Sequence, residues 1–336
     1  MNNPQTQHIF MMDHVKRESA YRPGEDFSLW QSMARAKLGT LLGMDTFEKC
    51  DDNLQIEWTK DKAEYTEYRL LFNTETHYQA RAHLRVPKDA QGAVPVVICL
   101  QGHATGMHIS LGVPKFPGDE ETISGGDRDF ARQVIAKGYA ALALEQRGFG
   151  ECGGTEKGPD CYQPAMAALL LGRTILGERV WDISRAIDLL EKHFPQVDVK
   201  RLAVMGNSGG GTATIYAAAM DERIAAAMPS CAFCGYKESI GVQHHCSCNY
   251  VPGVMRSFDM GDLTGLIAPR PLVIVNGLKD TIFPIDSARR EYRTTEKLYA
   301  AAGAPDMCRH IVGPEGHRFY AALGWPAFDA LTGWKR

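Results

Sequence analysis

Three side chains in this sequence have the types and the chain order that nucleophilic catalysis requires. Ser208 lies within Gly206-Asn207-Ser208-Gly209-Gly210, between an apolar run that ends at Met205 and an alanine-rich segment that begins at Thr212. A strand, a sharp turn and a helix here would place the hydroxyl at the apex of the turn, because glycines let the strand and helix pack closely. The backbone N–H of Gly209 would then open the helix and face a developing oxyanion.

A serine hydroxyl needs a base to take its proton, and the base needs a carboxylate to orient it. We expect the order serine, acid, histidine along the chain, with the acid and the base on loops that follow strands. Asp280 fits the acid, because it follows the apolar run 271–276 in a short loop. Its rivals are Asp286, which has the position of a helix N-cap, and Asp262, which lies in a long irregular segment.

The sequence has eleven histidines, so residue type alone does not identify the base. His317 follows the acid, lies on the loop after the last expected strand and precedes the final expected helix. His310 falls inside that strand, where a packed, hydrogen-bonded role is expected, and His244 and His245 precede Asp280. We therefore predict a triad of Ser208, Asp280 and His317.

A second oxyanion donor is expected from the loop that follows the apolar run 94–100. The loop reads Gln101-Gly102-His103-Ala104. The backbone N–H of His103 is the first candidate and that of Ala104 the second, and a plain glycine turn is the alternative.

The elements around these residues alternate between buried strands and amphipathic helices, which predicts a mostly parallel sheet of about eight strands with helices on both faces. Two alternating stretches, 64–73 and 78–86, predict an antiparallel hairpin at one edge. We expect residues 1–60 to form a helical segment that braces a main domain over 61–336, and residues 230–266 to be an insertion over the active site. The other expected strands cover 94–100, 139–144, 201–205, 224–228, 271–276 and 308–312, and the expected helices cover 130–137, 173–194, 212–220, 287–302 and 319–331.

From about Arg81 to the C-terminus, the sequence resembles the α/β-hydrolase superfamily and, within it, the acetyl-xylan-esterase-like branch related to dienelactone hydrolases. Gln101 departs from the His-Gly pattern of such proteins, but the donor in this loop is a backbone group. The resemblance implies an α/β-hydrolase fold and hydrolysis of acylated sugars, without specifying the acyl group or the alcohol. It is carried by Gln101-Gly102-His103, Gln146–Gly150, Gly206–Gly210, His245–Gly253, Ala268–Pro271, Asn276–Asp280 and Glu315–His317.

Cys231, Cys234, Cys246 and Cys248, with two adjacent histidines, have the residue types of a zinc site. Their spacing is not that of a standard finger or ribbon, and free cysteines are common small buried residues. We expect packed thiols, with structural zinc and a redox-sensitive pair as alternatives, and we expect neither a metal nor a cofactor in the reaction.

Other side chains could shape the substrate site. Arg147 follows a strand, so it could hold its loop through ion pairs or contact substrate, and an ion pair with Asp182 is one option. His245, Tyr250 and Phe258 lie in the expected insertion and are candidate lining residues, although aromatic residues in such places often only pack.

The composition excludes several classes of protein. The 336 residues carry a formal net charge of −3, with 44% hydrophobic and 23% charged residues, which is typical of a globular protein and gives no basic surface for nucleic acid. No apolar run approaches the length of a membrane span, and no signal peptide is visible, so we expect a cytoplasmic protein with mostly reduced cysteines. A homo-oligomer is compatible with these numbers.

These observations predict a serine esterase that acts on a small acyl ester, either a small molecule or an oligosaccharide, through an acyl-enzyme. An amidase, peptidase or lactone hydrolase of the same fold is the alternative, although the sequence lacks the blade repeats of a propeller domain. A non-catalytic protein of this fold is a further alternative, which the complete triad disfavours.

Overall fold

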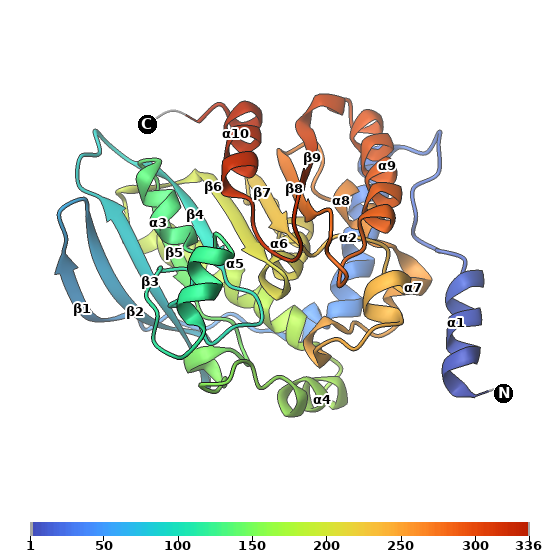
Figure 1. The fold of residues 1–336 in the computed structure, drawn as a ribbon, viewed down its shortest axis with the longest axis horizontal. Coiled ribbons are helices and arrows are strands. Elements are labelled where there is room, and N and C mark those ends of the chain that lie inside the picture. Colours follow the sequence, from blue (N-terminus) through green and yellow to red (C-terminus); the bar gives the residue numbers. More distant parts are fainter. Residues whose placement is uncertain (1–2, 335–336) are drawn as a thin grey trace.

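The computed structural model describes residues 3–334, which contain a nine-stranded mixed sheet (Figure 1). The strand order is β1-β2-β3-β5-β4-β6-β7-β8-β9. The first four strands in this order, β1, β2, β3 and β5, pair antiparallel with their neighbours among them. From β5 to β9 in this order, each strand pairs parallel with the next. The strands are β1 (Gln55–Asp61), β2 (Tyr65–Glu75), β3 (Tyr78–Pro87), β4 (Val94–Leu100), β5 (Ala140–Leu144), β6 (Val197–Asn207), β7 (Ala226–Ser230), β8 (Leu272–Gly277) and β9 (Cys308–Gly313).

Helices cover both faces of this sheet, as the alternation of elements predicts. One hydrophobic cluster joins the sheet to α2, α5, α6, α8 and α9, and a second joins the opposite face to α3 and α10. The helices are α1 (Pro4–His14), α2 (Phe27–Leu42), α3 (Phe130–Ala136), α4 (Tyr162–Leu170), α5 (Ile175–His193), α6 (Gly209–Met220), α7 (Val254–Ser257), α8 (Met260–Gly265), α9 (Ile285–Ala301) and α10 (Ala321–Thr332).

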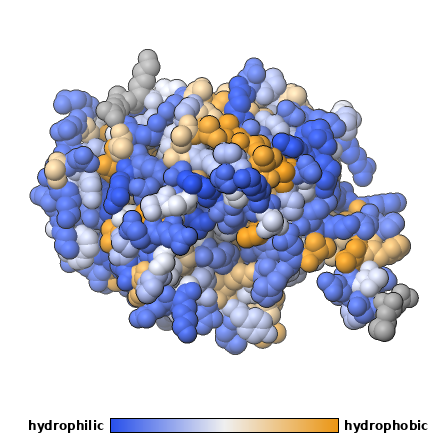
Figure 2. All heavy atoms as spheres, in the orientation of Figure 1, coloured by the Kyte–Doolittle hydropathy of each residue, from blue (hydrophilic) through white to orange (hydrophobic). Residues whose placement is uncertain are grey.

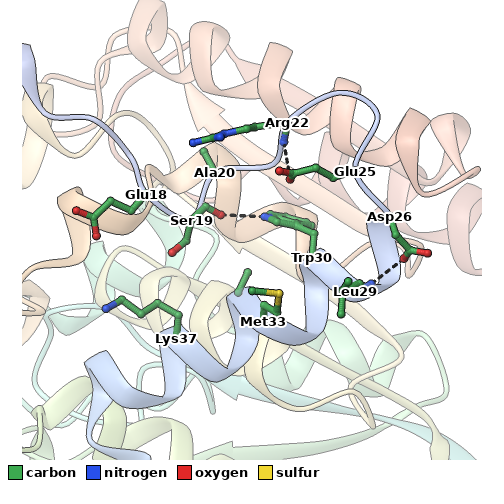
Figure 3. A pocket seen from close by; sticks show the side chains of 11 residues that line it. Glu18, Ser19, Ala20, Arg22, Glu25, Asp26, Leu29, Trp30, Met33 and Lys37 are labelled. Atoms are coloured by element: carbon green, nitrogen blue, oxygen red, sulfur yellow. Dashed lines mark hydrogen bonds between the residues drawn. The ribbon is translucent and has the colours of Figure 1, made fainter.

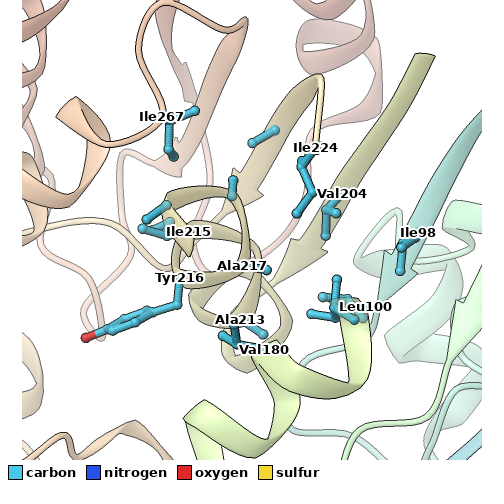
Figure 4. Packing of buried hydrophobic residues seen from close by; sticks show 14 of the residues in the cluster. Ile98, Leu100, Val180, Val204, Ala213, Ile215, Tyr216, Ala217, Ile224 and Ile267 are labelled. Carbon is cyan, nitrogen blue, oxygen red and sulfur yellow. The ribbon is translucent and has the colours of Figure 1, made fainter. Parts of the chain in front are cut away.

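The central strands are apolar throughout because both of their faces are buried. Along β4, Ile98 and Leu100 pack into the cluster beneath α5 and α6, whereas Val97 and Cys99 pack into the cluster beneath α3 and α10. Figure 4 shows the first of these faces, where Leu100 and neighbouring aliphatic side chains lie between the strands and the two helices. Successive residues of a strand point to opposite faces, so a doubly covered strand has no polar side.

The expectation of about eight strands is wrong by one, and the additional strand is β1. Its residues are almost all exposed, and its pairing with β2 shifts register between Ile56 and Trp58. An exposed edge strand has no buried face to impose an apolar alternation, so its sequence gives a weak signal. The segment 1–60, expected to be helical, contains α1 and α2 but ends in this strand.

The segment between β7 and β8 is mostly irregular and includes the short turns η4 (Lys237–Gly241) and η5 (Ser247–Asn249) before α7 and α8. At the other end of the chain, α1 extends from the body (Figure 1), and Phe10 and Met11 on it are exposed. The face shown in Figure 2 is largely hydrophilic, with apolar atoms gathered in its upper middle and beside α1. Among the described residues, no helix has the length and apolar character to cross a bilayer.

Helix α5 offers a direct test of the packing. Ile183 is 1% exposed and lies in the cluster beneath the sheet. We expect Ile183→Ala to lower the free energy of unfolding by about 2–5 kcal/mol, because the lost methylene contacts leave a cavity in a close-packed core. Urea unfolding measures this change. Glu191→Ala, on the exposed side of the same helix, is the control and should change stability by no more than about 0.5 kcal/mol.

Candidate active site

Ser208 occupies a strained turn between β6 and α6. Its backbone has φ 55° and ψ −120°, a conformation that L-residues rarely adopt. Its N–H donates to the Ser230 carbonyl at the end of β7 (2.8 Å), which ties the turn to the neighbouring strand. The sequence therefore correctly places the serine at the junction of a strand and a helix.

Asp280 and His317 meet across the loops that follow β8 and β9. Nδ1 of His317 lies 2.8 Å from Oδ2 of Asp280, and Oδ1 of Asp280 accepts the N–H groups of Ile282 (2.8 Å) and Phe283 (3.2 Å). Burial opposes ionisation, but these bonds together hold the pKa of Asp280 below its usual value. An ionised Asp280 fixes the imidazole with its proton on Nδ1 and leaves Nε2 as the basic nitrogen.

Ser208 and His317 line one cavity of about 250 Å³. Within residues 3–334, neither the Ser208 hydroxyl nor Nε2 of His317 has a hydrogen-bond partner. Nucleophile–base hydrogen bonds are often long or misaligned without substrate, so sharing a cavity is the relevant relation. The other lining residues are His103, Arg128, Gly209, His244, His245, Cys246, Asn249, Ile282 and Phe283.

The rival residues have other partners. Asp262 closes a capping box with Asp259 at the start of α8, and Asp286 pairs with Arg289 on α9. Nε2 of His310 lies 3.0 Å from Oδ1 of Asn276, and burial lowers the pKa of His310 to about 4. His310 is thus the packed histidine that its place in a strand predicts.

The loop after β4 packs directly on the turn that holds Ser208. A Cβ at Gly102 would lie 2.7 Å from the Asn207 carbonyl oxygen, and a Cβ at Gly209 would lie 2.7 Å from Cε1 of His103. Gly102 therefore excludes a side chain because it faces backbone, whereas a side chain at Gly209 would displace the His103 ring, and the two loops approach closely. The N–H groups of His103 and Gly209 have no partner among the described residues, whereas the Ala104 N–H donates to the Gly102 carbonyl (2.7 Å). Of the two candidates in this loop, His103 has the available donor.

A buried carboxylate holds this loop in place. Glu145, at the end of β5, is 1% exposed; it accepts the side-chain N–H of Gln101 and the backbone N–H of Met107. Gln101 thus stands where the usual His-Gly pattern has a histidine, and its side-chain amide donates to the Glu145 carboxylate. Burial raises the pKa of Glu145 to about 7. Glu145 was not predicted from the sequence, because a lone acid after a strand has no distinctive pattern.

Arg147 lies in a buried network outside the catalytic cavity. Its guanidinium makes two 2.8 Å bonds to Asp182, one 2.8 Å ion pair with Glu75 and a contact 3.8 Å from the Tyr78 ring centre. The sequence offered two roles for Arg147, ion pairing and substrate contact. The structure shows the ion pairs, including the one with Asp182, and places Arg147 away from the residues that line the cavity.

The three candidate lining residues between β7 and β8 lie in three different places. His245 lines the cavity, its Nε2 lies 2.9 Å from the Ser239 hydroxyl, and burial lowers its pKa to about 4. Tyr250 is 43% exposed and lines a separate groove against α1, and Phe258 is buried in the hydrophobic core. The structure brings only His245 of these three into the catalytic cavity.

Two cavity residues were missed in the sequence. Arg128 donates from Nη2 to the His317 carbonyl (2.9 Å), and its buried Nε has no partner among the described residues. The Phe283 ring stacks on the imidazole of His317, with centres 6.0 Å apart. Neither residue belongs to a motif, and both reach the site through the arrangement of their loops.

The cysteines do not gather as their spacing suggests. Cys231 lies beside Asp280 and His317, donates to the Arg318 carbonyl (3.2 Å) and has its pKa raised to about 12 by burial. Cys234 lies in the hydrophobic core. Cys246 and Cys248 instead meet His103 from the loop after β4. All nine cysteines are free.

A separate hollow of about 650 Å³ lies between the segment that follows α1 and helix α2 (Figure 3). Its ordered contacts are structural: Nε1 of Trp30 donates to the Ser19 carbonyl (2.8 Å), and the Leu29 N–H donates to Asp26 at the helix N-cap. The residues that line the hollow include no nucleophile with a neighbouring base, so the reactive groups lie in the smaller cavity.

Glu145 should leave a measurable pH signature in stability. The unfolded chain releases this proton near the ordinary pKa of 4.5, whereas the folded chain holds it to about 7. The unfolded state binds fewer protons between these values, so the free energy of unfolding falls as pH rises through that window. We expect Glu145→Gln to lessen the fall by on the order of 3 kcal/mol, as measured by urea unfolding at pH 5 and pH 8.

The exposed Glu156→Gln is the matched control and should retain the wild-type dependence on pH. An unchanged fall in Glu145→Gln would show that the Glu145 proton is not held in the folded state.

Comparison with known proteins identifies relatives of this chain. YtaP of Bacillus subtilis (strain 168), named as a hydrolase, is 27% identical over 272 residues, which cover 79% of this chain and 87% of YtaP. A structure described as an acetyl xylan esterase from Bacteroides fragilis NCTC 9343 has a TM-score of 0.77 and 17% identity, covering 98% of this chain and 90% of that one. A glucuronoyl esterase from Solibacter usitatus has a TM-score of 0.67 and 17% identity, covering 95% and 98%.

The two solved structures share the fold of this chain, which is that of the α/β-hydrolases. The family model for acetyl xylan esterase (AXE1) matches residues 42–250, a span that includes the loop after β4 and the Ser208 turn. The resemblance seen in the sequence is therefore confirmed: the chain belongs to the acetyl xylan esterase family and is an esterase.

Proposed function

We propose that this esterase removes short acyl groups, acetyl foremost, from carbohydrate esters through a covalent acyl-enzyme on Ser208. The observation that carries the proposal is the cavity where the strained Ser208 turn faces a histidine already bonded to Asp280. Membership of the acetyl xylan esterase family supports an acetyl ester as the bond and a carbohydrate as the alcohol.

In the first half of the reaction, Oγ of Ser208 attacks the acyl carbon while Nε2 of His317 takes the hydroxyl proton. The carbonyl oxygen becomes an oxyanion, which the N–H groups of Gly209 and His103 stabilise. The oxyanion collapses, the bond to the sugar oxygen breaks, and His317 returns its proton to that oxygen. The products are the free alcohol and acylated Ser208.

In the second half, His317 takes a proton from water, and the resulting hydroxide attacks the acyl carbon. The tetrahedral intermediate uses the same two donors, and its collapse returns the proton to Ser208 and releases the carboxylic acid. Throughout, Asp280 stabilises the imidazolium that forms twice in the cycle.

The cavity favours a short acyl group on a polar alcohol. Its volume of about 250 Å³ lies below that of pockets for drug-sized ligands. His244, His245 and Asn249 line it, so sugar hydroxyls would meet hydrogen-bonding groups. Arg128 also lines the cavity, and its guanidinium adds a positive charge there. The nine free cysteines support a reducing compartment, the cytoplasm, as the site of action.

Two substitutions test the triad. With p-nitrophenyl acetate, we expect Ser208→Ala to abolish acyl-enzyme turnover and Asp280→Asn to lower kcat by about 10³–10⁴-fold, because the asparagine no longer holds the imidazole in the required tautomer. A fluorophosphonate probe should label the wild type and fail to label Ser208→Ala. Ser124→Ala, an exposed serine, is the control. Wild-type rates in Ser208→Ala would refute the mechanism.

A substrate series tests the acyl group and the bond. We expect kcat/KM to fall steadily from p-nitrophenyl acetate to the butyrate and octanoate esters, because longer chains exceed the cavity. Acetylated xylo-oligosaccharides should be deacetylated, with acetate release as the measurement. Preference for octanoate, or faster cleavage of acetyl anilides or lactones than of acetyl esters, would favour the alternative hydrolase activities.

A further inference from the structure

Four metal-ligating side chains from three separate segments converge beside the catalytic cavity. The ligand atoms of His103, Cys246 and Cys248 all lie within 4.8 Å of one another, and Nε2 of His103 is 3.1 Å from Sγ of Cys248. The thiol of Cys161, from the loop before α4, interacts with both other thiols but stands outside this 4.8 Å group. Cys161 and Cys248 are buried, and His103 and Cys246 are half-buried.

A buried cation beside these thiols has no carboxylate partner. Arg179, on α5, is fully buried and lies in no ion pair with a carboxylate among the residues described. Its guanidinium donates to the Arg147 carbonyl (2.7 and 3.1 Å) and to Sγ of Cys161 (3.3 Å), and it lies over the Phe149 ring. A buried positive charge without a counter-charge is costly, so the neighbouring sulfur atoms are the groups that can supply the negative charge.

We propose that His103, Cys161, Cys246 and Cys248 form a tetrahedral Zn²⁺ site. Three thiolates and one neutral imidazole are a standard ligand set for structural zinc, and such a site places ligand atoms about 3.5–3.8 Å apart. His103, Cys246 and Cys248 need only small side-chain shifts to reach this spacing, and Cys161 would move toward them as the fourth ligand. Zn²⁺ with three thiolates carries a net charge of −1, which the positive charge of Arg179 balances. The three thiol protons leave to solvent when the metal binds.

The ligands of this proposed site differ from the four cysteines that the spacing in the sequence suggests. Cys231 and Cys234 are excluded, His103 belongs to the group instead, and Cys161 is added from beside it. The cation would join the loop after β4 to the insertion between β7 and β8. His103 would then bind the metal through its ring and, if the proposed mechanism holds, the oxyanion through its backbone. That last consequence alone rests on the proposed function.

Metal analysis of the purified protein tests the site without reference to activity. We expect protein prepared with zinc in the medium and dialysed without chelator to hold about one Zn²⁺ per chain. Cys246→Ser and Cys248→Ser should hold about ten-fold less or lower still. Cys50→Ser, a cysteine of similar exposure outside the site, is the matched control for Cys246→Ser and should retain the metal. Ser208→Ala should retain it too, which separates this proposal from the esterase mechanism.

Cobalt gives a second measurement that does not depend on any variant folding. Co²⁺ added to the metal-free wild type should produce a thiolate-to-cobalt charge-transfer band and the strong visible bands of tetrahedral cobalt. Three results would overturn the proposal: zinc below about 0.1 per chain with no thiolate–cobalt band, undiminished zinc in both cysteine variants, or a disulfide joining Cys161 to Cys246 or Cys248 in peptide mapping of the wild type.

Discussion

The close approach of the loop after β4 to the turn after β6 is the constraint on which the rest of the site depends. The two strands are parallel neighbours, so both loops emerge at the same edge of the sheet. Gly102 leaves no room for a side chain where the loops meet, and a side chain at Gly209 would displace the His103 ring. This contact brings the loop of His103 against the turn of Ser208, whose backbone conformation L-residues rarely adopt.

The strain is sustained by the packing beneath it. Helix α6 is buried along almost its whole length, and β6 is covered on both faces, so the turn between them cannot relax without disturbing the core. On the opposite side, Glu145 accepts hydrogen bonds from the Gln101 side chain and the Met107 N–H, and so holds two points of the loop after β4. Burial raises the pKa of Glu145, because the carboxylate that organises the loop is withdrawn from water.

Most of the fold and the three proposed triad residues could be predicted from the sequence, because the features that place them are local. Strands covered on both faces read as continuous apolar runs, and a serine flanked by glycines between a strand and a helix is typical of a nucleophile turn. Asp280 and His317 were identified by chain order and by their loops after strands, which the parallel topology converts into spatial proximity. The exposed strand β1 lacked such a pattern and was missed.

Contacts between side chains from distant loops could not be predicted from the sequence. Spacing grouped Cys231 and Cys234 with Cys246 and Cys248, but Cys231 follows β7 and lies beside Asp280 and His317, and Cys234 lies in the core. His103 and Cys161 reach Cys248 only because the loop after β4, the loop before α4 and the insertion meet at the same edge of the sheet. Arg128 and Phe283 reach His317 in the same way. The catalytic loops and the cysteine loops thus share one edge, so any group that fixes the second set also limits the movement of the first.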